Sequence, residues 1–300
     1  MKNAGAGLRV AAVILTKNEE RDLPGCLQSL QGFASDVYVV DSGSTDRTVQ
    51  LAEQSGAQVL VHKFESHSQQ FNWALDNIST DAEWIFKIDA DERMEANLVN
   101  YLLSAMPNVS DEVKGFLIPR RICFLGRKMR FGDTYPVWLL RLWRKGFGRS
   151  EDRLMDEQIV LSTGQTARAR GDLIHVIPKD LTEWTAKHNW YATRECTDIL
   201  SLNGDIQVGG PAGERRRMKQ SVFLRLPPFF RSFAYWIYRY FVKLGFLDGK
   251  AGLIYHFLQG FWYRFLVDAK LHEHAVHQQY LREQDTPGEL THAGGRLDEN

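Results

Sequence analysis

The sequence predicts an α/β fold with a mainly parallel sheet, followed by a helical region rich in aromatic and basic residues. Three observations support this prediction. Over the first 90 or so residues, strand-like apolar runs alternate with helix-like runs at the spacing of βαβ units. Three of the strand-like runs end in polar or acidic residues. Beyond residue 212, Phe, Tyr and Trp are interleaved with Arg and Lys.

The composition is that of a globular protein with an apolar core. The 300 residues are 44% hydrophobic and 25% charged, and the formal net charge of zero argues against a general polyanion binder. The charge is uneven, with 15 acidic against 5 basic side chains over 18–95 and 11 basic against 3 acidic over 212–270. Three widely spaced cysteines fit neither a zinc site nor a disulfide framework, which favours a reducing cytoplasm. No run is long and apolar enough to predict a transmembrane helix.

The elements of the first part follow one another in order. A buried strand is expected over 8–15, and a helix then begins at Asp22, a suitable N-cap, with Pro24 in its first turn. A second strand over 36–40 leads into a helix that Gly56 closes. The series continues with a strand, a helix and a fourth strand at 58–64, 68–78 and 84–88.

The alternation weakens after residue 95. A strand pair is expected over 115–129, a further strand over 137–146 and a helix with one apolar face over 180–200. A Gly-rich stretch at 203–214 indicates a boundary. The predicted organisation is therefore an α/β domain, a helical region and a disordered polar tail at 1–212, 213–285 and 286–300.

Acidic residues gather where these strands end. In an open parallel sheet the carboxyl ends of the strands share one edge, where ligands bind. Asp89 and Asp91 are two positions apart and point the same way from an extended segment. Paired carboxylates suit Mg²⁺ or Mn²⁺, which in turn holds a diphosphate. An Asp-x-Asp triplet alone is weak evidence, but this one follows the fourth strand on the edge that also carries Asp41.

Three motifs in this order resemble the family 2 glycosyltransferases, which have the GT-A fold. They are "AVILTKNEERDLPGCLQSL", "VYVVDSGSTDRT" and "WIFKIDADE". The chain is most similar to bacterial enzymes that build lipopolysaccharide core or related surface glycans. The resemblance is strongest over 8–95 and extends more weakly to about residue 190.

The resemblance implies roles for the matching residues. Asp41 would hydrogen-bond the base, most often uracil, while Asp89 would touch the ribose or a metal-bound water and Asp91 would ligate the metal. Gln70 and Asn72 are equally well explained as exposed polar residues of a helix. The nucleotide-binding set implied is Thr16, Asn18, Glu19, Asp41, Ser42, Gln70, Asn72 and Asp89.

An inverting enzyme of this kind needs a general base that deprotonates the acceptor hydroxyl. "RLMDEQIVL" supplies Asp156 and Glu157 just before an apolar strand, and the alignment with the family favours Glu157. The acids Glu151 and Asp152 lie close by and fit the spacing less well.

Two further residues have both a functional and a structural interpretation. His175 stands at the end of a short apolar run. The resemblance implies that it approaches the diphosphate or the metal, although a lone histidine is more often structural. Arg141 would neutralise the leaving diphosphate or, equally well, form a surface salt bridge.

The basic, aromatic region allows three interpretations. Single-stranded nucleic acid binding is disfavoured because no nucleic-acid motif is present. Helices lying in a membrane interface would use aromatic side chains at headgroup depth and cations on anionic lipid. A helical hairpin packed on protein would show the same spacing of Arg231, Arg239 and Lys243. The interfacial interpretation is favoured, because the enzymes that the chain resembles use lipid-linked acceptors.

The sequence thus predicts an inverting, metal-dependent glycosyltransferase that binds a nucleotide-sugar donor, a UDP-sugar for preference. Its acceptor would be a lipopolysaccharide core or other lipid-linked glycan, at the inner face of the cytoplasmic membrane. Two alternatives remain at this point. A sugar nucleotidyltransferase would open with a Gly-rich basic loop that "LTKNEERDL" lacks. A non-catalytic homologue would bind nucleotide-sugar or membrane without turnover.

Overall fold

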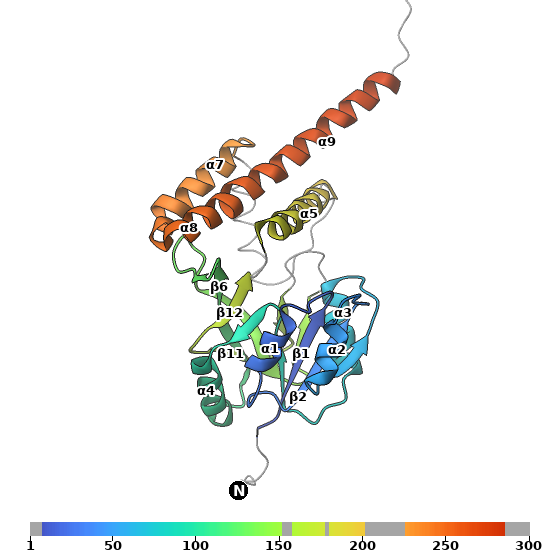
Figure 1. Ribbon diagram of the computed structural model, residues 1–300, viewed down its shortest axis with the longest axis vertical. Coiled ribbons are helices and arrows are strands. Elements are labelled where there is room, and N and C mark those ends of the chain that lie inside the picture. Colours follow the sequence, from blue (N-terminus) through green and yellow to red (C-terminus); the bar gives the residue numbers. More distant parts are fainter. Residues whose placement is uncertain (1–7, 152–157, 178–179, 202–225, 286–300) are drawn as a thin grey trace, which may run out of the picture. The chain divides into compact units, whose positions relative to one another are not determined.

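The computed structural model divides into two compact units, each built from two segments of the chain (Figure 1). The residues that the structure describes are 8–151, 158–177, 180–201 and 226–285. Unit 1 consists of Met1–Leu181 and Ile237–Phe257, and unit 2 of Thr182–Trp236 and Leu258–Asn300.

A mixed sheet lies at the centre of unit 1 (Figure 1). Its strand order is β3-β2-β1-β4-β8-β6-β12-β5, and β7 and β11 also pair with β6. β9 (Gly148–Ser150) and β10 (Ile159–Leu161) form a separate antiparallel pair. The sheet strands are β1 (Val10–Thr16), β2 (Asp36–Asp41), β3 (Gln58–Val61), β4 (Trp84–Lys87), β5 (Glu92–Met94), β6 (Val113–Phe124), β7 (Arg127–Lys128), β8 (Val137–Arg144), β11 (Gln165–Arg168) and β12 (Leu173–Ile177).

The strand directions place the ends of distant strands on one edge. β1, β2, β3 and β4 pair in parallel, as the alternating pattern predicts. β8 is antiparallel to both β4 and β6, so β6 runs in the same direction as β4, and β12 is parallel to β6. The carboxyl ends of β1, β2, β4, β6 and β12 therefore all lie at the same edge. The predicted α/β class is confirmed. The strands β1 to β4 are parallel, and the strands that follow them add both parallel and antiparallel pairs to the sheet.

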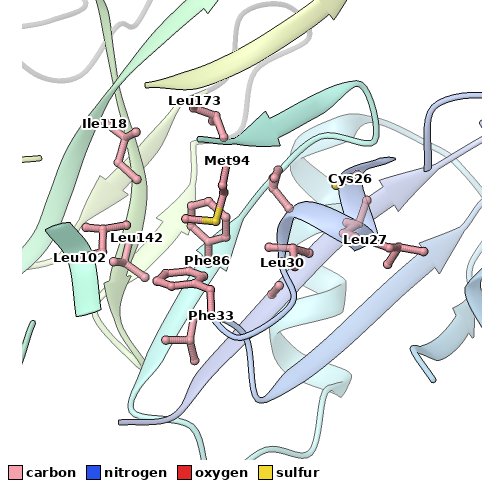
Figure 2. Packing of buried hydrophobic residues seen from close by; sticks show 14 of the residues in the cluster. Cys26, Leu27, Leu30, Phe33, Phe86, Met94, Leu102, Ile118, Leu142 and Leu173 are labelled. Atoms are coloured by element: carbon pink, nitrogen blue, oxygen red, sulfur yellow. The ribbon is translucent and has the colours of Figure 1, made fainter. Parts of the chain in front are cut away.

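Helices cover both faces of the sheet, because β1 is apolar on both sides. Val10, Ala12 and Ile14 pack with α1 and α4 in one core, part of which Figure 2 shows. Ala11 and Val13 pack with α3 in a second core on the opposite face. The covering helices are α1 (Leu23–Ser29), α2 (Thr48–Gln54), α3 (His67–Asn77) and α4 (Ala96–Ala105), which the short η1 (Met106–Asn108) follows.

The local signals for helix and turn ends are largely confirmed. Asp22 occupies the N-cap of α1 and Pro24 lies in its first turn, but the Asp22 side chain makes no capping hydrogen bond. Gly56 follows α2 with a φ of 83°, a left-handed conformation that suits glycine. The predicted strand pair over 115–129 is the β6–β7 hairpin, whose turn consists of Leu125 and Gly126, both at positive φ.

The region after β12 is helical, as predicted, with two long helices, α5 and α9, and a series of short and π- or 3₁₀-helical segments between them. The helix expected over 180–200 is α5, whereas the expected boundary at 203–214 and the tail at 286–300 lie outside the described residues. Among the residues described, no helix is both long and apolar enough to cross a bilayer. The elements are α5 (Leu181–Ser201), α7 (Phe230–Ile237), the π-helix η2 (Tyr238–Val242), the 3₁₀ turn η3 (Gly245–Asp248), α8 (Gly249–Tyr255), the π-helix η4 (His256–Trp262) and α9 (Tyr263–Asp285).

Unit 2 is held together by an apolar core and a buried ion pair. Ala192 of α5 packs with Tyr263 and Val267 of α9. Asp268 is 3% exposed and accepts hydrogen bonds from Nε of Arg231 at 2.9 Å and from the backbone N–H of Phe229 at 2.8 Å. The Asp268 carboxylate therefore ties the start of α7 to α9.

His256 is a fully buried histidine of unit 1 whose ring lies against two glycines. A Cβ atom at Gly132 or Gly245 would come within 2.0 or 2.6 Å of ring atoms, so a hydrogen alone fits at these positions. Neither ring nitrogen has a hydrogen-bond partner in the described part of the chain. Burial, reinforced by the charge of Arg239, lowers the pKa of His256 to about 3.

The low pKa of His256 predicts a loss of stability in mild acid. Unfolded His256 takes up a proton near pH 6.5, whereas the folded residue resists protonation down to about pH 3. The unfolded state binds more protons in this window, so the free energy of unfolding falls by about 1.4 kcal/mol per pH unit as the pH drops below 6.5. The free energy of unfolding, measured with urea at about pH 7 and about pH 5, should fall by about 2 kcal/mol more in the wild type than in His256→Leu. Equal pH dependence would contradict the buried neutral state.

Candidate functional site

The polar ends of β1, β2 and β4 come together at one edge of the sheet, as predicted. Thr16 is paired in register with Asp41, and its hydroxyl donates a 3.0 Å hydrogen bond to the Asp41 carboxylate. β4 pairs with β1 on the other side, and Asp89 follows it two residues after Lys87. The three segments that the sequence placed on one edge therefore do share it.

Asp41 is almost fully buried, with 1% of its surface exposed. Its carboxylate accepts hydrogen bonds from the backbone N–H groups of Gly43 and Ser44 at 2.8 and 2.7 Å and from the Ser44 hydroxyl at 2.5 Å. Together with Thr16, these donors fix the turn that follows β2. The geometry thus gives Asp41 a structural role in this turn, and its contact with a base stays a prediction.

Asn18 and Gln70 fasten the neighbouring loops. Asn18 has a φ of 55°; its backbone N–H donates to the Ser44 hydroxyl at 2.8 Å, and its side-chain oxygen accepts from the backbone of Thr45 at 2.8 Å. Gln70 is fully buried and donates to the Ser42 hydroxyl at 2.8 Å, while its carbonyl oxygen has no partner in the described part of the chain. These contacts hold the loop in which a nucleotide is expected.

Two other predicted nucleotide-binding residues make contacts with protein groups. The backbone N–H of Glu19 donates to the Thr48 hydroxyl at 2.7 Å. Asn72 exchanges two 2.9 Å hydrogen bonds with the backbone of Ser150, so its amide fixes β9 against α3. Asn72 is therefore more than an exposed helix residue, and no nucleotide contact is needed to explain it.

Arg141 joins two carboxylates at the end of β4. Its Nη2 donates to Asp89 at 2.7 Å and to Glu92 at 2.8 Å. The side chain of Glu92 is fully buried and that of Arg141 is 7% exposed, whereas that of Asp89 is 43% exposed. Arg141 thus lies in a buried ion-pair network rather than in a surface salt bridge, and its contact with a diphosphate stays a prediction.

The two carboxylates of this network differ in proton affinity. Burial raises the pKa of Glu92 more than the Arg141 guanidinium lowers it. Desolvation alone would raise the pKa of Asp89, but the charges of Arg141 and Lys87 outweigh it and hold this pKa well below its usual range. Asp89 therefore remains a carboxylate at neutral pH, and part of its surface is open to a ligand.

Asp91 and His175 lie in contact beside the end of β4; we call Asp89 and Asp91, with His175 beside Asp91, the acidic rim. Nε2 of His175 lies 3.3 Å from the Asp91 carboxylate, and the two side chains are 26% and 25% exposed. The backbone N–H of Val176 donates to the Asp91 carbonyl at 2.8 Å, which holds β12 beside this loop. Asp91 and His175 are thus in contact, and Asp89 lies two residues before Asp91 in the loop after β4. Residues 90–91 form a turn rather than the expected extended segment, and the backbone N–H of Glu92 closes it by donating to the Asp89 carbonyl at 2.9 Å.

Arg120 lies on the same face of the sheet and was missed by sequence reasoning. On β6 it is in register with Val137 of β8 and Leu173 of β12, so it lies on the face that also carries Glu92 and His175. Its positive charge acts on Asp89, Glu92 and His175. Within the described residues it forms no ion pair, and its buried Nε has no hydrogen-bond partner. The doublet "RR" in a strand-like run was the one available signal.

The predicted general bases, Asp156 and Glu157, lie outside the described residues. The residues that flank them are described. Glu151 and Gln158 exchange two hydrogen bonds of 2.9 and 3.1 Å beside β9 and β10. The carboxylate of Glu151, the less favoured candidate for the general base, therefore accepts a hydrogen bond within this strand pair.

The donor set fits a divalent cation that is shared with a substrate. In the described part of the chain no three His, Cys, Asp or Glu side chains form a cage for a metal on their own. Asp89 and Asp91 offer hard, partly exposed carboxylate oxygens, and His175 offers a nitrogen beside them. Mg²⁺ is commonly held by one or two carboxylates with substrate phosphates and water, and such a shell requires no cage. The residues present therefore fit Mg²⁺ or Mn²⁺.

Comparisons with known proteins agree with this arrangement. Residues 11–170 match the model of the family described as glycosyl transferase family 2. The chain is 31% identical over 280 residues to the lipopolysaccharide core biosynthesis glycosyltransferase LpsC of Rhizobium meliloti, which covers 90% of this chain and 94% of that protein. It is 25% identical over 282 residues to an uncharacterized glycosyltransferase of Rickettsia prowazekii, covering 90% of this chain and 89% of that protein.

Solved structures match over a smaller part of the chain. Glucosyl-3-phosphoglycerate synthase from Mycobacterium tuberculosis, in complex with Mn²⁺, UDP and glucosyl-3-phosphoglycerate, is 22% identical with a TM-score of 0.32. That match covers 39% of this chain and 44% of the synthase. S. aureus TarS 1–349 in complex with UDP is also 22% identical, with a TM-score of 0.33 over 38% of this chain and 36% of TarS.

Family membership therefore rests on the sequence matches and agrees with the sheet topology. The family model covers more than half of the chain, and the Rhizobium enzyme matches almost its whole length. The predicted GT-A-like arrangement is present: β1 to β4 are parallel, β8 is antiparallel to β4, and the acidic loop follows β4. A sugar nucleotidyltransferase is thereby set aside. The chain is a glycosyltransferase and belongs to glycosyl transferase family 2.

Proposed function

We propose that this family 2 glycosyltransferase transfers a sugar, with inversion, from a UDP-sugar to a lipopolysaccharide core or other lipid-linked glycan. The observation that carries the proposal is the pair Asp89 and Asp91 at the carboxyl edge of the parallel strands. Asp89 is held as a carboxylate by Arg141 and keeps 43% of its side chain exposed. A rim of this kind attracts a divalent cation, and with it the diphosphate of a donor.

The metal site would use Asp91, with Asp89 and His175 beside it. Mg²⁺ or Mn²⁺, when bound, supplies positive charge that stabilises the departing nucleoside diphosphate. The buried pair of Arg141 and Glu92 fixes the direction of the Asp89 carboxylate. Glu92 also accepts a hydrogen bond from the backbone N–H of Asp89 at 3.1 Å, so the loop is held before a ligand arrives.

Arg120 is the cation best placed to meet a diphosphate. It faces the acidic rim from the central strand β6, and none of the described carboxylates pairs with it. A guanidinium binds phosphate oxygens with two parallel hydrogen bonds, which suits a leaving diphosphate. We therefore assign to Arg120 the role that the sequence suggested for Arg141, whose Nη2 already serves two carboxylates.

The displacement itself needs a base near the acceptor. Glu157, or its neighbour Asp156, would accept the proton of the acceptor hydroxyl as that oxygen forms its bond to the anomeric carbon. The bond from the anomeric carbon to the diphosphate breaks at the same time, and the nucleoside diphosphate leaves with the electron pair. Attack from the face opposite the leaving group inverts the anomeric configuration.

The nature of the acceptor is supported by a relative. The Rhizobium protein that matches 90% of this chain is a lipopolysaccharide core biosynthesis glycosyltransferase. A lipid-linked acceptor is held at a membrane surface and nucleotide sugars are cytoplasmic, so we place the enzyme at the inner face of the cytoplasmic membrane. Lipid contact would then be part of its function.

Calorimetric titration with UDP tests the donor site. UDP should bind in the presence of Mn²⁺ and lose most of its affinity when EDTA is added, because the diphosphate and the rim are both anionic. Arg120→Met should weaken binding of UDP with Mn²⁺ by about tenfold or more, the loss expected for a charge-assisted hydrogen bond to phosphate. Arg149→Met, which removes an exposed guanidinium paired with Asp76, serves as the control and should bind normally.

The outcomes separate the parts of the proposal. Binding of another nucleoside diphosphate but not of UDP would change the donor and leave the rim assignment standing. Normal UDP affinity in Arg120→Met would refute the role of Arg120. Absence of nucleotide binding in a folded sample would refute the proposed donor site.

A further inference from the structure

One segment of unit 1 exposes many large apolar side chains. Residues 238–257 cover η2, η3, α8 and the first residues of η4. Val242 is 65% exposed and Phe241 50%, and the turn of the adjacent β6–β7 hairpin adds Leu125 at 50%. We call this set the 238–257 surface; its exposed apolar members are Leu125, Tyr238, Phe241, Val242, Leu244, Phe246, Leu247, Leu253 and Phe257. Exposed apolar residues gathered in this way are typical of an interaction site.

The opposite side of the segment is firmly packed. Tyr255 lies in a core with Phe124 and Met129, and Ile254 packs against that core. Asp248 is 1% exposed and accepts hydrogen bonds from the backbone of the loop that follows β7. The exposed side chains therefore belong to an ordered element with its own core.

Hydrogen bonds tie the segment to unit 1 at further points. Nε of Arg239 donates to the Gly132 carbonyl at 2.8 Å, and the Gly132 N–H donates to the Lys243 carbonyl at 2.8 Å. Arg127 donates to the Leu247 carbonyl at 3.0 Å. These hydrogen bonds fix the backbone of the segment. Binding of its exposed apolar side chains to another surface would therefore not require the backbone to become ordered.

The position of the segment relates it to the candidate site. The core beneath it includes Phe124 and Ile122 at the end of β6, and Ile177 at the end of β12. β6 and β12 run in the same direction as β1 and β4, so these ends lie at the edge that carries Asp89 and Asp91. The 238–257 surface and the acidic rim therefore share one edge of the sheet.

The charges around the surface favour an anionic occupant. Five exposed cations lie on this segment and on the adjoining β7 region, whereas Asp133 is the exposed acid of the same stretches. Two of the five have acidic partners, since Lys128 is ion-paired with Glu95 and Arg127 lies 3.8 Å from the buried Asp248. Apolar and aromatic side chains bordered by Lys and Arg are typical of binding to a bilayer with anionic headgroups. A second copy of the surface would bring like charges together. The cations are Arg127, Lys128, Arg130, Lys243 and Lys250.

We propose that the 238–257 surface docks on an anionic phospholipid bilayer and thereby turns the acidic edge of unit 1 toward the membrane. The apolar side chains enter the headgroup region, and the cations remain at the level of the lipid phosphates. The consequence for the acceptor rests on the proposed function, since a lipid-linked glycan would then meet the donor site without leaving the bilayer. The lipid contact itself does not depend on which nucleotide or acceptor the enzyme uses.

Vesicle binding by the full chain tests the proposal. The wild type should sediment with vesicles of phosphatidylcholine and phosphatidylglycerol, bind vesicles of phosphatidylcholine alone more weakly, and dissociate as salt is added. The double variant Val242→Asp/Leu247→Asp should lower partitioning on anionic vesicles at least about tenfold, because two exposed apolar side chains become charged. Leu103→Asp, at an exposed leucine near the carboxyl end of α4, is the control and should bind as the wild type.

Several results would overturn the docking surface. It fails if the wild type ignores anionic vesicles, if the double variant binds them normally, or if Val276→Asp on α9 abolishes binding instead. It also fails if the double variant disrupts a dimer rather than lipid binding. Titration of the double variant with UDP and Mn²⁺ separates the two proposals. Retained UDP affinity with lost vesicle binding supports the surface, whereas vesicle binding by a wild type that binds no nucleotide would leave the surface standing and the donor site refuted.

Discussion

Asp91→Asn should lose at least about 10³-fold in kcat while the protein remains folded. An amide in place of the carboxylate removes an anionic metal ligand, and stabilisation of a leaving diphosphate by a metal amounts to several kcal/mol, at about 1.4 kcal/mol per tenfold in rate. Asp91 is partly exposed, so the substitution leaves the core intact. Release of UDP from the UDP-sugar that supports turnover, measured under saturating Mn²⁺, gives kcat directly.

A matched control separates a general loss of negative charge from loss of the ligand. Asp111→Asn removes a carboxylate that is 82% exposed in its side chain and lies just before β6. This variant should keep its turnover and its unfolding midpoint. Wild-type turnover in Asp91→Asn would refute the metal assignment, and so would an equal loss in the two variants.

The location of the site could be predicted from the sequence because it follows from strand direction. Once the strands ending at Thr16, Asp41 and Asp89 are interpreted as parallel, their carboxyl ends must share an edge. That inference needs only the local alternation of apolar and polar runs. The structure pairs Thr16 with Asp41 directly, and the metal-site candidates Asp91 and His175 also meet.

The partners of the acids could not be predicted, because they depend on long-range order in the sheet. β8 inserts antiparallel between β4 and β6, and that insertion brings Arg141 to Asp89 across 52 positions of sequence. Strand order of this kind is not encoded in local periodicity. The same limit applies to Arg120, whose neighbours are set by the register of β6 with β8 and β12.

The loop residues show a second limit. Asp41 and Asn18 read from the sequence as ligands for a nucleotide, yet their side chains accept hydrogen bonds from loop backbone. Asp and Asn commonly bond to nearby backbone in turns, and the sequence does not tell which side-chain atoms remain for a ligand. A residue type suited to binding is often equally suited to building the loop.

Arg141→Met should lower the free energy of unfolding by about 3–5 kcal/mol, the second large effect that we expect. Removing one partner of a buried ion pair leaves an uncompensated charge, and Glu92 is fully buried with no other cation as an ion-pair partner among the described residues. Methionine retains much of the apolar volume of the arginine stem, so the loss reflects charge more than packing. Urea unfolding followed by circular dichroism measures it.

An exposed arginine that also contacts two carboxylate oxygens, here of a single aspartate, provides the comparison. Arg149 donates to both oxygens of Asp76 at 2.7 and 2.8 Å, but both side chains are 56% exposed. Arg149→Met should therefore cost less than about 1 kcal/mol, because water screens this pair and solvates the carboxylate that remains. The contrast between two guanidinium groups, each in contact with two carboxylate oxygens, isolates the contribution of burial.

A second substitution distinguishes an isolated buried charge from a general defect at Arg141. Glu92→Gln in the Arg141→Met background removes the stranded carboxylate and keeps an acceptor for the Asp89 N–H. The double variant should recover about half of the lost stability or more, since the two residues are directly coupled. Additive losses in the double variant would show that the stability of this edge does not arise from the Arg141–Glu92 pair. Recovery of stability without recovery of turnover would instead place Arg141 among the groups that orient Asp89 for the reaction.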